Sequence, residues 1–284
     1  MLGTQSAKSK RQEFKSVQRL QRVLLCRPDY FDVDYIINPL MQPHSVDRQL
    51  ALKQWLNLKS TYEKIGVEVE VINQEQGVPD MVFATDHGVV LNGSVLLANF
   101  RYNQRRKESV YFQKWFTDYS FNHKSLNPLS FLEGGDTRFF GDKLFVGSGF
   151  RASENITEEI QEQLGIEVVQ LKQINPEFYH LDMAFLPINK QTAFYCPEAF
   201  DLQSQKILKQ QVPNLIKLNK KAAHSYAANS VVSGKDILTQ CTEPSFLKVL
   251  SDNGLNVHQV DVSEFNKAGG GIRCLTLILD MEEN

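Results

Sequence analysis

The sequence predicts an α/β fold with a single domain, built from five similar units that each contain a β-hairpin, a helix and a strand. The first observation is that hairpin signals recur at intervals of about 45 to 55 residues. The second is that a helical pattern and a short apolar strand follow each hairpin. The third is that the last strand has no later partner, whereas a strand near the start of the chain can pair with it. We therefore expect the N- and C-terminal strands to pair, which closes the domain and protects its edges.

The unit that joins the two ends is expected to use a strand over residues 20–26, which Arg27-Pro28-Asp29 ends with turn chemistry. Ser45 is expected to cap the following helix, because apolar residues then recur at helical spacing as far as Gly66. Alternating apolar residues predict a strand over 67–72.

The other four units follow the same order of elements. Asn92-Gly93 is a strong hairpin signal and predicts a hairpin over 81–100, after which a helix is expected over 107–119. The last strand, which belongs to the unit that joins the two ends of the chain, is expected over 274–279. The remaining expected ranges are hairpin 139–145, helix 153–164 and strand 168–171, then hairpin 183–195, helix 203–211 and strand 215–218, then hairpin 230–238, helix 245–253 and strand 257–260.

The composition is that of an ordinary globular protein, with 284 residues, 42% hydrophobic and 23% charged. No linker rich in Gly, Pro or Ser divides the chain, so we expect one domain over residues 16–284 after a loose polar tail at 1–15. The net charge of -2 gives no long-range attraction to nucleic acid or anionic membranes, and no apolar run of about 18 residues occurs. We therefore expect neither nucleic acid nor membrane as a partner, while a homo-oligomer stays open.

The four cysteines lie far apart without CxxC spacing, which argues against a zinc site and a disulfide framework and favours a reducing, cytoplasmic compartment. Cys26, Cys196 and Cys241 are expected in the core. Cys274 differs because three glycines at 269–271 precede it, and residues without a Cβ allow a close approach of the backbone. Taken alone, this pattern favours another buried core cysteine. It also fits a nucleophile held at a crowded point where the last strand begins.

Two further stretches contain the partners that a nucleophilic thiol requires. Glu133 lies in Leu132-Glu133-Gly134-Gly135-Asp136 and supplies a carboxylate, while His180 lies in Tyr179-His180-Leu181-Asp182 and supplies an imidazole. The cysteine follows the histidine in the chain. This order argues against a papain-like hydrolase, in which the cysteine comes first.

Four motifs in this order resemble those of the guanidine-modifying superfamily, which includes arginine deiminases, dimethylargininases and amidinotransferases. The resemblance extends from Cys26-Arg27-Pro28 to the C-terminus and implies the pentein fold, a five-fold pseudosymmetric ring of ββαβ units around a central channel. This fold agrees with the repeat described above. The motifs are Met81-Val82-Phe83 with Asp86, Glu133-Gly134-Gly135-Asp136, His180-Leu181-Asp182 and Gly270-Gly271-Ile272-Arg273-Cys274.

The resemblance implies an amidinohydrolase that cleaves a C–N bond of a guanidino substrate through an amidino thioester on Cys274. A guanidinium carbon is a poor electrophile, so the reaction needs a thiolate, whose formation the cationic substrate can favour. His180 would protonate the departing nitrogen and then activate water, because imidazole gives and takes protons near neutral pH. Glu133 would contact the guanidinium and hold the charge of the imidazole. No metal and no organic cofactor are implied.

The same resemblance assigns residues to the two ends of the substrate. Asp86 and Asp182 would bind the guanidinium nitrogens through charge-assisted hydrogen bonds, although Asp182 could instead be a turn residue. The orientation of His87 beside Asp86 stays open. The other substrate-binding residues implied are Arg151 and Arg105 at an α-carboxylate, Asp80 as a second-sphere or amine contact, and Asn38 in a substrate loop.

Each assignment at the far end of the substrate has a simpler alternative. Arg105 could be a solvated charge like the two basic residues that follow it, and Arg101 competes for its role. Arg151 could pair with a surface acid. Asn38 precedes a proline and could be only a turn residue.

The catalytic residues do not separate hydrolysis from amidino transfer, because both reactions share the covalent intermediate. The chain length favours a hydrolase, since transferases of this superfamily tend to be longer. Asp182 resembles the arginine deiminases, and Asp86 replaces an asparagine typical of arginine dihydrolases, which favours citrulline with ammonia or methylamine over ornithine. Arginine and Nω-methylated arginine both stay open as substrates. The alternatives are an amidinotransferase, an arginine dihydrolase, which the stretch at 30–39 resembles, and a non-catalytic pentein binding protein, which would not need this catalytic set.

Overall fold

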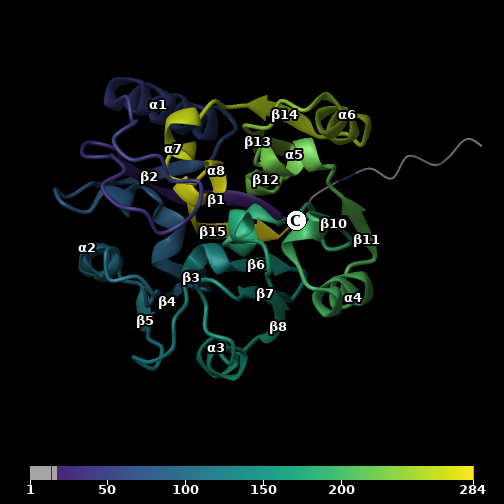
Figure 1. Ribbon diagram of the computed structural model, residues 1–284, viewed down its shortest axis with the longest axis horizontal. Coiled ribbons are helices and arrows are strands. Elements are labelled where there is room, and N and C mark those ends of the chain that lie inside the picture. Colours follow the sequence, from purple (N-terminus) through teal and green to yellow (C-terminus); the bar gives the residue numbers. More distant parts are fainter. Residues whose placement is uncertain (1–13, 15–17, 284) are drawn as a thin grey trace, which may run out of the picture.

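The computed structural model describes residue 14 and residues 18–283 and shows a mixed α/β fold with five three-stranded sheets. In every sheet the first strand is antiparallel to the middle strand, and the middle strand is parallel to the third. A helix connects the middle and third strands each time, so each unit is ββαβ. Figure 1 shows the sheets around the middle of the molecule and these helices at its outer edge. The predicted α/β class and the repeated unit are therefore confirmed.

The first sheet combines the two ends of the described chain. Its middle strand β1 (Gln18–Arg27) pairs antiparallel with β15 (Leu277–Glu283) and parallel with β2 (Glu68–Asn73), and α1 (Arg48–Lys64) connects β1 to β2. Leu24 lies opposite Leu277 and is fully buried. The predicted pairing of the terminal strands is thus present.

The other four sheets follow in chain order, each with the helix between its second and third strands. They are β3 (Gly88–Leu91), β4 (Ser94–Leu97) and β5 (Asn122–Lys124) with α2 (Ser109–Asp118); β6 (Thr137–Phe140), β7 (Lys143–Ser148) and β8 (Glu167–Lys172) with α3 (Thr157–Leu164); β9 (Phe185–Pro187), β10 (Thr192–Tyr195) and β11 (Asn214–Lys217) with α4 (Leu202–Gln211); and β12 (Val231–Ser233), β13 (Asp236–Thr239) and β14 (Asn256–Gln259) with α6 (Pro244–Asp252). Three short helices, α5 (Lys220–His224), α7 (Ser263–Asn266) and α8 (Ile272–Leu275), lie outside this pattern.

Three local predictions differ from the structure. Asp47 caps α1, because its carboxylate accepts hydrogen bonds from the backbone N–H groups of Gln49 and Leu50, whereas the Ser45 hydroxyl donates to a backbone carbonyl. The first arm of the hairpin predicted at 81–100 is mostly 3₁₀ turns, with a strand only from Gly88. Cys274 lies in α8 rather than in a strand, and β15 begins at Leu277.

Of the predicted tail at 1–15, the structure describes only Phe14. This residue is buried, its ring contacts Phe194 at a centroid distance of 6.1 Å, and its N–H donates to the carbonyl of Asn253. Phe14 therefore belongs to the core, and the rest of that predicted tail lies outside the described residues.

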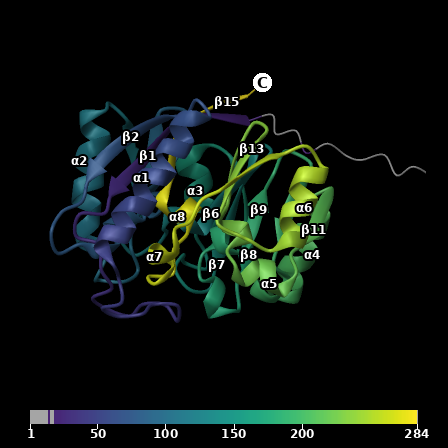
Figure 2. The ribbon, with the colours of Figure 1, turned by 90° about the horizontal axis from the view of Figure 1, so that it is seen from above.

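The segment before the first strand of each sheet carries a buried polar side chain. Asp86 precedes β3, Glu133 precedes β6, Asp182 precedes β9, Asn229 precedes β12 and Cys274 precedes β15. Equivalent positions in repeated units lie close together, so the fold collects groups that are far apart in sequence. In Figure 2, α8 lies in the middle of the molecule, while β15 reaches the edge at which the chain ends.

No helix within the described residues is long and apolar enough to cross a membrane.

Candidate active site

A small pocket is lined by most of the predicted site residues. Cys274, Asp86, Asp80, Arg105, Arg151 and Asn38 line it together with Ile37, Met41, Phe83, Tyr179, Ala268 and Gly270. His180, Glu133 and Asp182 lie beside these residues without lining the pocket themselves. All nine predicted residues are buried, with at most 7% of the surface of any of them exposed.

Cys274 is held in place by the glycines that precede it. Gly269 has a φ of +90°, which favours glycine, and a Cβ on Gly270 would lie 2.1 Å from the Phe83 ring. The chain can therefore pass against the pocket wall and turn into α8 just before the thiol. This observation fits the close approach that the three glycines predict.

Asn229 contacts the thiol directly, and the sequence motifs did not point to it. Its Nδ2 donates to Cys274 Sγ at 3.2 Å, and its Oδ1 accepts from the N–H groups of Arg273 at 3.0 Å and Cys274 at 3.3 Å. A donor beside sulfur favours the thiolate over the thiol. The position of Asn229 before β12, equivalent to that of Asp86 before β3, is the signal that could have identified it.

We expect Asn229→Ala to lower kcat/KM by about 10- to 100-fold, because a hydrogen bond to a charged group contributes about 1.5–3 kcal/mol. The variant should also need a higher pH for alkylation of Cys274. Asn214→Ala removes a half-buried amide that bonds to Thr192 in β10, and it serves as the control. Wild-type kinetics in Asn229→Ala would show that the amide has no role at the sulfur.

The free thiol lies in an environment that disfavours its charge. Burial raises the pKa of Cys274 well above its ordinary value, and the carboxylates of Asp182 and Asp86 raise it further. Asp182 Oδ2 is 3.6 Å from Sγ, and burial also raises the pKa of Asp182. A cation bound between these groups would stabilise both the thiolate and the carboxylate. The site is therefore arranged for a cationic substrate.

The alkylation of Cys274 by iodoacetamide should consequently be slow at pH 7 in the absence of substrate. Because the raised pKa confines the thiolate to alkaline solution, the rate should rise about tenfold per pH unit and continue to rise beyond pH 9. Peptide mass spectrometry separates Cys274 from the other three cysteines. A plateau of the rate below pH 8 would contradict the expectation.

His180 is held as an imidazolium by three carboxyl groups. Its Nε2 lies 3.0 Å from Glu133 Oε2, and its Nδ1 lies 3.6 Å from Asp86 Oδ1. Burial acts to lower the pKa of His180, but Asp86, Asp136 and Glu133 outweigh it and raise the pKa to about 9. His180 can therefore donate a proton at neutral pH.

Glu133 connects His180 to Arg151. Arg151 Nη1 donates to Glu133 Oε2 at 2.8 Å, and its guanidinium lies over the rings of Tyr102 at 4.8 Å and Tyr179 at 4.7 Å. Burial alone would raise the pKa of Glu133, but Arg151 and His180 keep it well below its ordinary value. Glu133 is thus an anion throughout the neutral range. The acid that pairs with Arg151 is buried at the site and is not a surface acid.

Arg105 is buried, so it is not a solvated surface charge. Its guanidinium donates to Asp86 Oδ2 at 2.5 Å, to Glu108 Oε2 at 2.8 Å and to the carbonyl of Asp80 at 3.1 Å. Arg101 is exposed, and its Nε donates to the carbonyl of Arg151. The structure therefore places Arg105, and not Arg101, in the pocket wall.

His87 supports Arg105 from outside the pocket. The imidazole stacks on Phe112 with centroids 3.5 Å apart, and its Nε2 lies 3.0 Å from the same Glu108 Oε2 that accepts from Arg105. Burial, followed by the charge of Arg105, lowers the pKa of His87 to about 3. His87 is therefore a neutral residue behind Glu108 and does not narrow the pocket.

Asp80 and Asn38 have partners within the pocket wall. Asp80 Oδ2 accepts from the Tyr35 hydroxyl at 2.9 Å, and burial raises the pKa of this carboxyl to about 7. Asn38 Nδ2 donates to the carbonyl of Ala268, and its Oδ1 accepts from the N–H of Leu40. Asn38 thus ties the loop after β1 to the segment that leads to Cys274.

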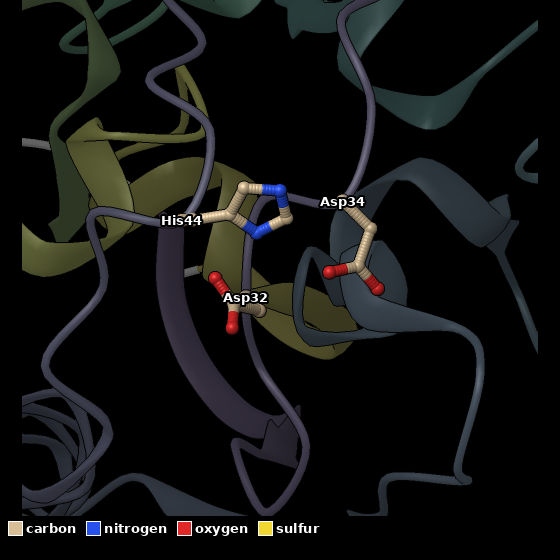
Figure 3. Close-up of side chains that lie close together, drawn as sticks. All are labelled: Asp32, Asp34 and His44. Atoms are coloured by element: carbon tan, nitrogen blue, oxygen red, sulfur yellow. The ribbon is translucent and has the colours of Figure 1, made fainter.

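Two groups of side chains have the composition of a metal site. Asp86, Glu133 and His180 are one group, and they belong to the pocket just described. Asp32, Asp34 and His44 are the other, and Figure 3 shows them gathered on the loop between β1 and α1. Asp32 already accepts from Arg48 and from the N–H of Val33. Exposed groups of this kind are common without an ion, so this loop carries no assignment here.

Comparison with known proteins places the chain in a family. The family model described as "N,N dimethylarginine dimethylhydrolase, eukaryotic" matches residues 28–280. The N(G),N(G)-dimethylarginine dimethylaminohydrolase of Mycobacterium tuberculosis is 33% identical, over 91% of this chain and 86% of the relative. The bifunctional arginine dihydrolase/ornithine cyclodeaminase ArgZ of Synechocystis is 35% identical over 90% of this chain, but the chain spans only 37% of ArgZ.

A solved structure of the N-terminal domain of ArgZ has a similar fold. This cysteine-to-serine variant, bound to its substrate, has a TM-score of 0.89 and 33% identity, covering 91% of this chain and 98% of that domain. The family match, together with the pocket around Cys274, confirms the superfamily that the motifs predict. The chain therefore belongs to the N,N-dimethylarginine dimethylhydrolase family within the guanidine-modifying superfamily, and it is a hydrolase acting on C–N bonds of guanidino compounds.

Proposed function

We propose that this protein hydrolyses arginine or an Nω-methylated arginine to citrulline, releasing ammonia or a methylamine. The observation that carries the proposal is a set of buried polar atoms without hydrogen-bond partners. Asp86 Oδ1, Glu133 Oε1 and His180 Nδ1 have no hydrogen-bond partner within the described residues. Such atoms are costly to bury, and two of them are carboxylate oxygens that accept hydrogen bonds. A guanidinium offers the positive charge and the N–H donors that these oxygens need.

Substrate binding would generate the nucleophile. The guanidinium would bind to Asp86 and Asp182, which removes the main electrostatic penalty on the Cys274 thiolate. Asn229 would donate to the sulfur as its charge forms. Arg151 and Arg105 lie in the wall of the same pocket and would bind the substrate's α-carboxylate, with Asp80 available to the α-ammonium. Asn38 would hold the loop over the bound substrate.

The chemical steps then use the thiolate and the imidazolium in turn. The sulfur attacks the guanidinium carbon and forms a C–S bond, giving a tetrahedral adduct. His180 donates its proton to the departing nitrogen, the C–N bond breaks, and an amidino thioester stays on Cys274. The neutral imidazole then takes a proton from water, and the resulting hydroxide attacks the same carbon. Collapse of this second adduct breaks the C–S bond, its hydroxyl proton passes to solvent, and citrulline and the thiolate are released.

A relative supports the covalent step. An asparagine-to-serine variant of the ArgZ N-terminal domain has been solved covalently bound to a reaction intermediate. The likeness to ArgZ also supports a second candidate, an arginine dihydrolase that continues to ornithine. Asp86 favours the single hydrolysis, because the dihydrolase branch typically has asparagine at this position. Amidino transfer remains a third candidate that shares the thioester.

The test is incubation of the purified protein with L-arginine, asymmetric dimethylarginine or agmatine, followed by identification of the products by mass spectrometry. Citrulline with ammonia from arginine would identify a deiminase, and citrulline with dimethylamine from the methylated substrate would identify a dimethylargininase. Ornithine would support the dihydrolase. If no compound is converted and none forms an adduct on Cys274, hydrolysis of these substrates is refuted.

Three further features belong to the proposal. We infer a closed five-fold ring of the five ββαβ units, which the pairing of β1 with β15 supports. A cytoplasmic location would keep Cys274 reduced. The small-molecule partner is the guanidino substrate itself, and a homo-oligomer remains a prediction.

A further inference from the structure

A second cavity lies next to the segment that carries Cys274, because Arg273 lines it. Its space amounts to about 970 Å³, including the part open to solvent, and it shares no lining residue with the active-site pocket. The first strands of the other four sheets, β3, β6, β9 and β12, each line the cavity with two or more residues, and β15 contributes Leu277, Ile278 and Met281.

Two arginines line this cavity next to the catalytic segments. Arg138 lies in β6 and is only 8% exposed, and its Nη2 donates to backbone carbonyls, including that of Ala228 at 3.0 Å. Arg273 immediately precedes Cys274 and donates to the Thr85 hydroxyl and a backbone carbonyl. The Nε atoms of both arginines are buried and have no hydrogen-bond partner within the described part of the chain.

Neither guanidinium has a carboxylate partner within the described residues. Among the described residues, no Asp or Glu oxygen lies within 4.0 Å of Arg138 or Arg273. Burial lowers the pKa of Arg138 to about 9, with the like charge of Arg273 as the next cause. Burial also lowers the pKa of Arg273, while the more distant Asp182 opposes this change. Two like charges therefore share an interior position without a bonded counterion, which is unfavourable for both.

The rest of the cavity wall indicates what could supply the counterion. The described lining residues include no aspartate or glutamate, so this described part of the wall offers a ligand's ammonium group no carboxylate. Much of the wall is apolar, formed by residues such as Leu20, Val89, Phe139, Leu186, Val232 and Leu277. An amino acid fits this wall poorly, whereas an anion with a hydrocarbon chain matches both its charge and its apolar surface.

We propose that this cavity binds a small organic monoanion, a carboxylate with a short hydrocarbon chain. The carboxylate pairs with Arg138 and Arg273, and the chain lies along the apolar strands. The bound anion is close to the segment that carries Cys274, so its charge disfavours the thiolate. Because coupling between two sites is reciprocal, formation of the thiolate also weakens binding of the anion. The ligand is therefore an inhibitor that does not compete with the substrate for its pocket.

Calorimetric titration of the full chain with hexanoate tests the proposal, with hexanol and hexylammonium as uncharged and cationic probes of similar length. We expect saturable binding of one hexanoate per chain and no binding of the other two. Val232→Phe fills the cavity with a larger side chain and should weaken hexanoate binding at least about tenfold while leaving the substrate's KM unchanged. Val90→Phe on the neighbouring strand β3 is the second filling variant. Val110→Phe, on the exposed side of α2, should change neither quantity.

The outcomes are distinct. If hexanoate binds Val232→Phe and Val90→Phe as tightly as it binds the wild type, its binding site is not this cavity. It could then bind at Arg105 and Arg151 in the substrate pocket, and the proposal is overturned. Absence of saturable binding up to about 10 mM overturns it as well. Equal binding of hexanol would show that the arginines play no part. These results do not depend on which guanidino compound the enzyme hydrolyses.

Discussion

Cys274→Ser should lower the turnover of any guanidino substrate on the order of 10⁴-fold or more. A serine hydroxyl is far less acidic than a thiol. It therefore stays protonated even with the substrate's charge, Asn229 and the imidazolium beside it, and no alkoxide nucleophile forms. The pocket itself should stay intact, because the oxygen replaces sulfur with little change in shape. The dissociation constant for the substrate, measured by calorimetry, should therefore change by no more than a few-fold. A substrate complex of the corresponding ArgZ variant agrees with this expectation.

Intact-protein mass spectrometry provides the second measurement. Wild-type protein that is quenched during turnover should carry the mass of an amidino adduct, and Cys274→Ser should carry none. Cys241→Ser makes the same chemical change at a buried thiol outside the pocket, and it should retain both turnover and adduct. An adduct that persists in Cys274→Ser would locate the nucleophile elsewhere and refute the mechanism.

The fold and most of the site could be predicted from the sequence because both follow from one repeated unit. Once the hairpin signals establish the ββαβ repeat, the residues before each first strand must come together, which brings Cys274 near Asp182 and His180 near Glu133. Their residue types are those of thiol chemistry, so motifs alone could point to them. The terminal sheet was predictable for a similar reason, since only the strand at 20–26 was left to pair with the last one.

Other features depend on contacts that no local pattern records. Asn229 is a neutral amide in a stretch without a recognisable motif. It donates a hydrogen bond to the Cys274 sulfur only because α8 lies beside it. The N–H groups of Arg273 and Cys274 donate to Asn229 at the start of a helical turn, where the apolar residues predict a strand. Likewise, the basic run at 105–107 gives no sign that Arg105 alone turns inward to Glu108, with His87 behind it.

His180→Asn should reduce kcat by about 10² to 10⁴-fold, the usual range for loss of a general acid and base. The asparagine can still donate to Glu133, so the change removes proton transfer more than it removes structure. In the wild-type enzyme, kcat/KM should fall as pH rises through about 9, because His180 of the free enzyme then loses the proton that the departing nitrogen needs. This alkaline decrease should be absent in His180→Asn.

The control for this variant is His258→Asn, which replaces a half-buried histidine paired with Asp236 at 2.7 Å, outside the pocket. It should keep the wild-type rate and the alkaline decrease. Full pH profiles of kcat/KM for the three proteins provide the comparison. If His180→Asn kept activity within about tenfold of wild type, water or another side chain would have to supply the proton. His180 lies between the carboxylates of Asp86 and Glu133, which hold its positive charge. Activity without His180 would therefore mean that this charged imidazolium is not the general acid of the reaction.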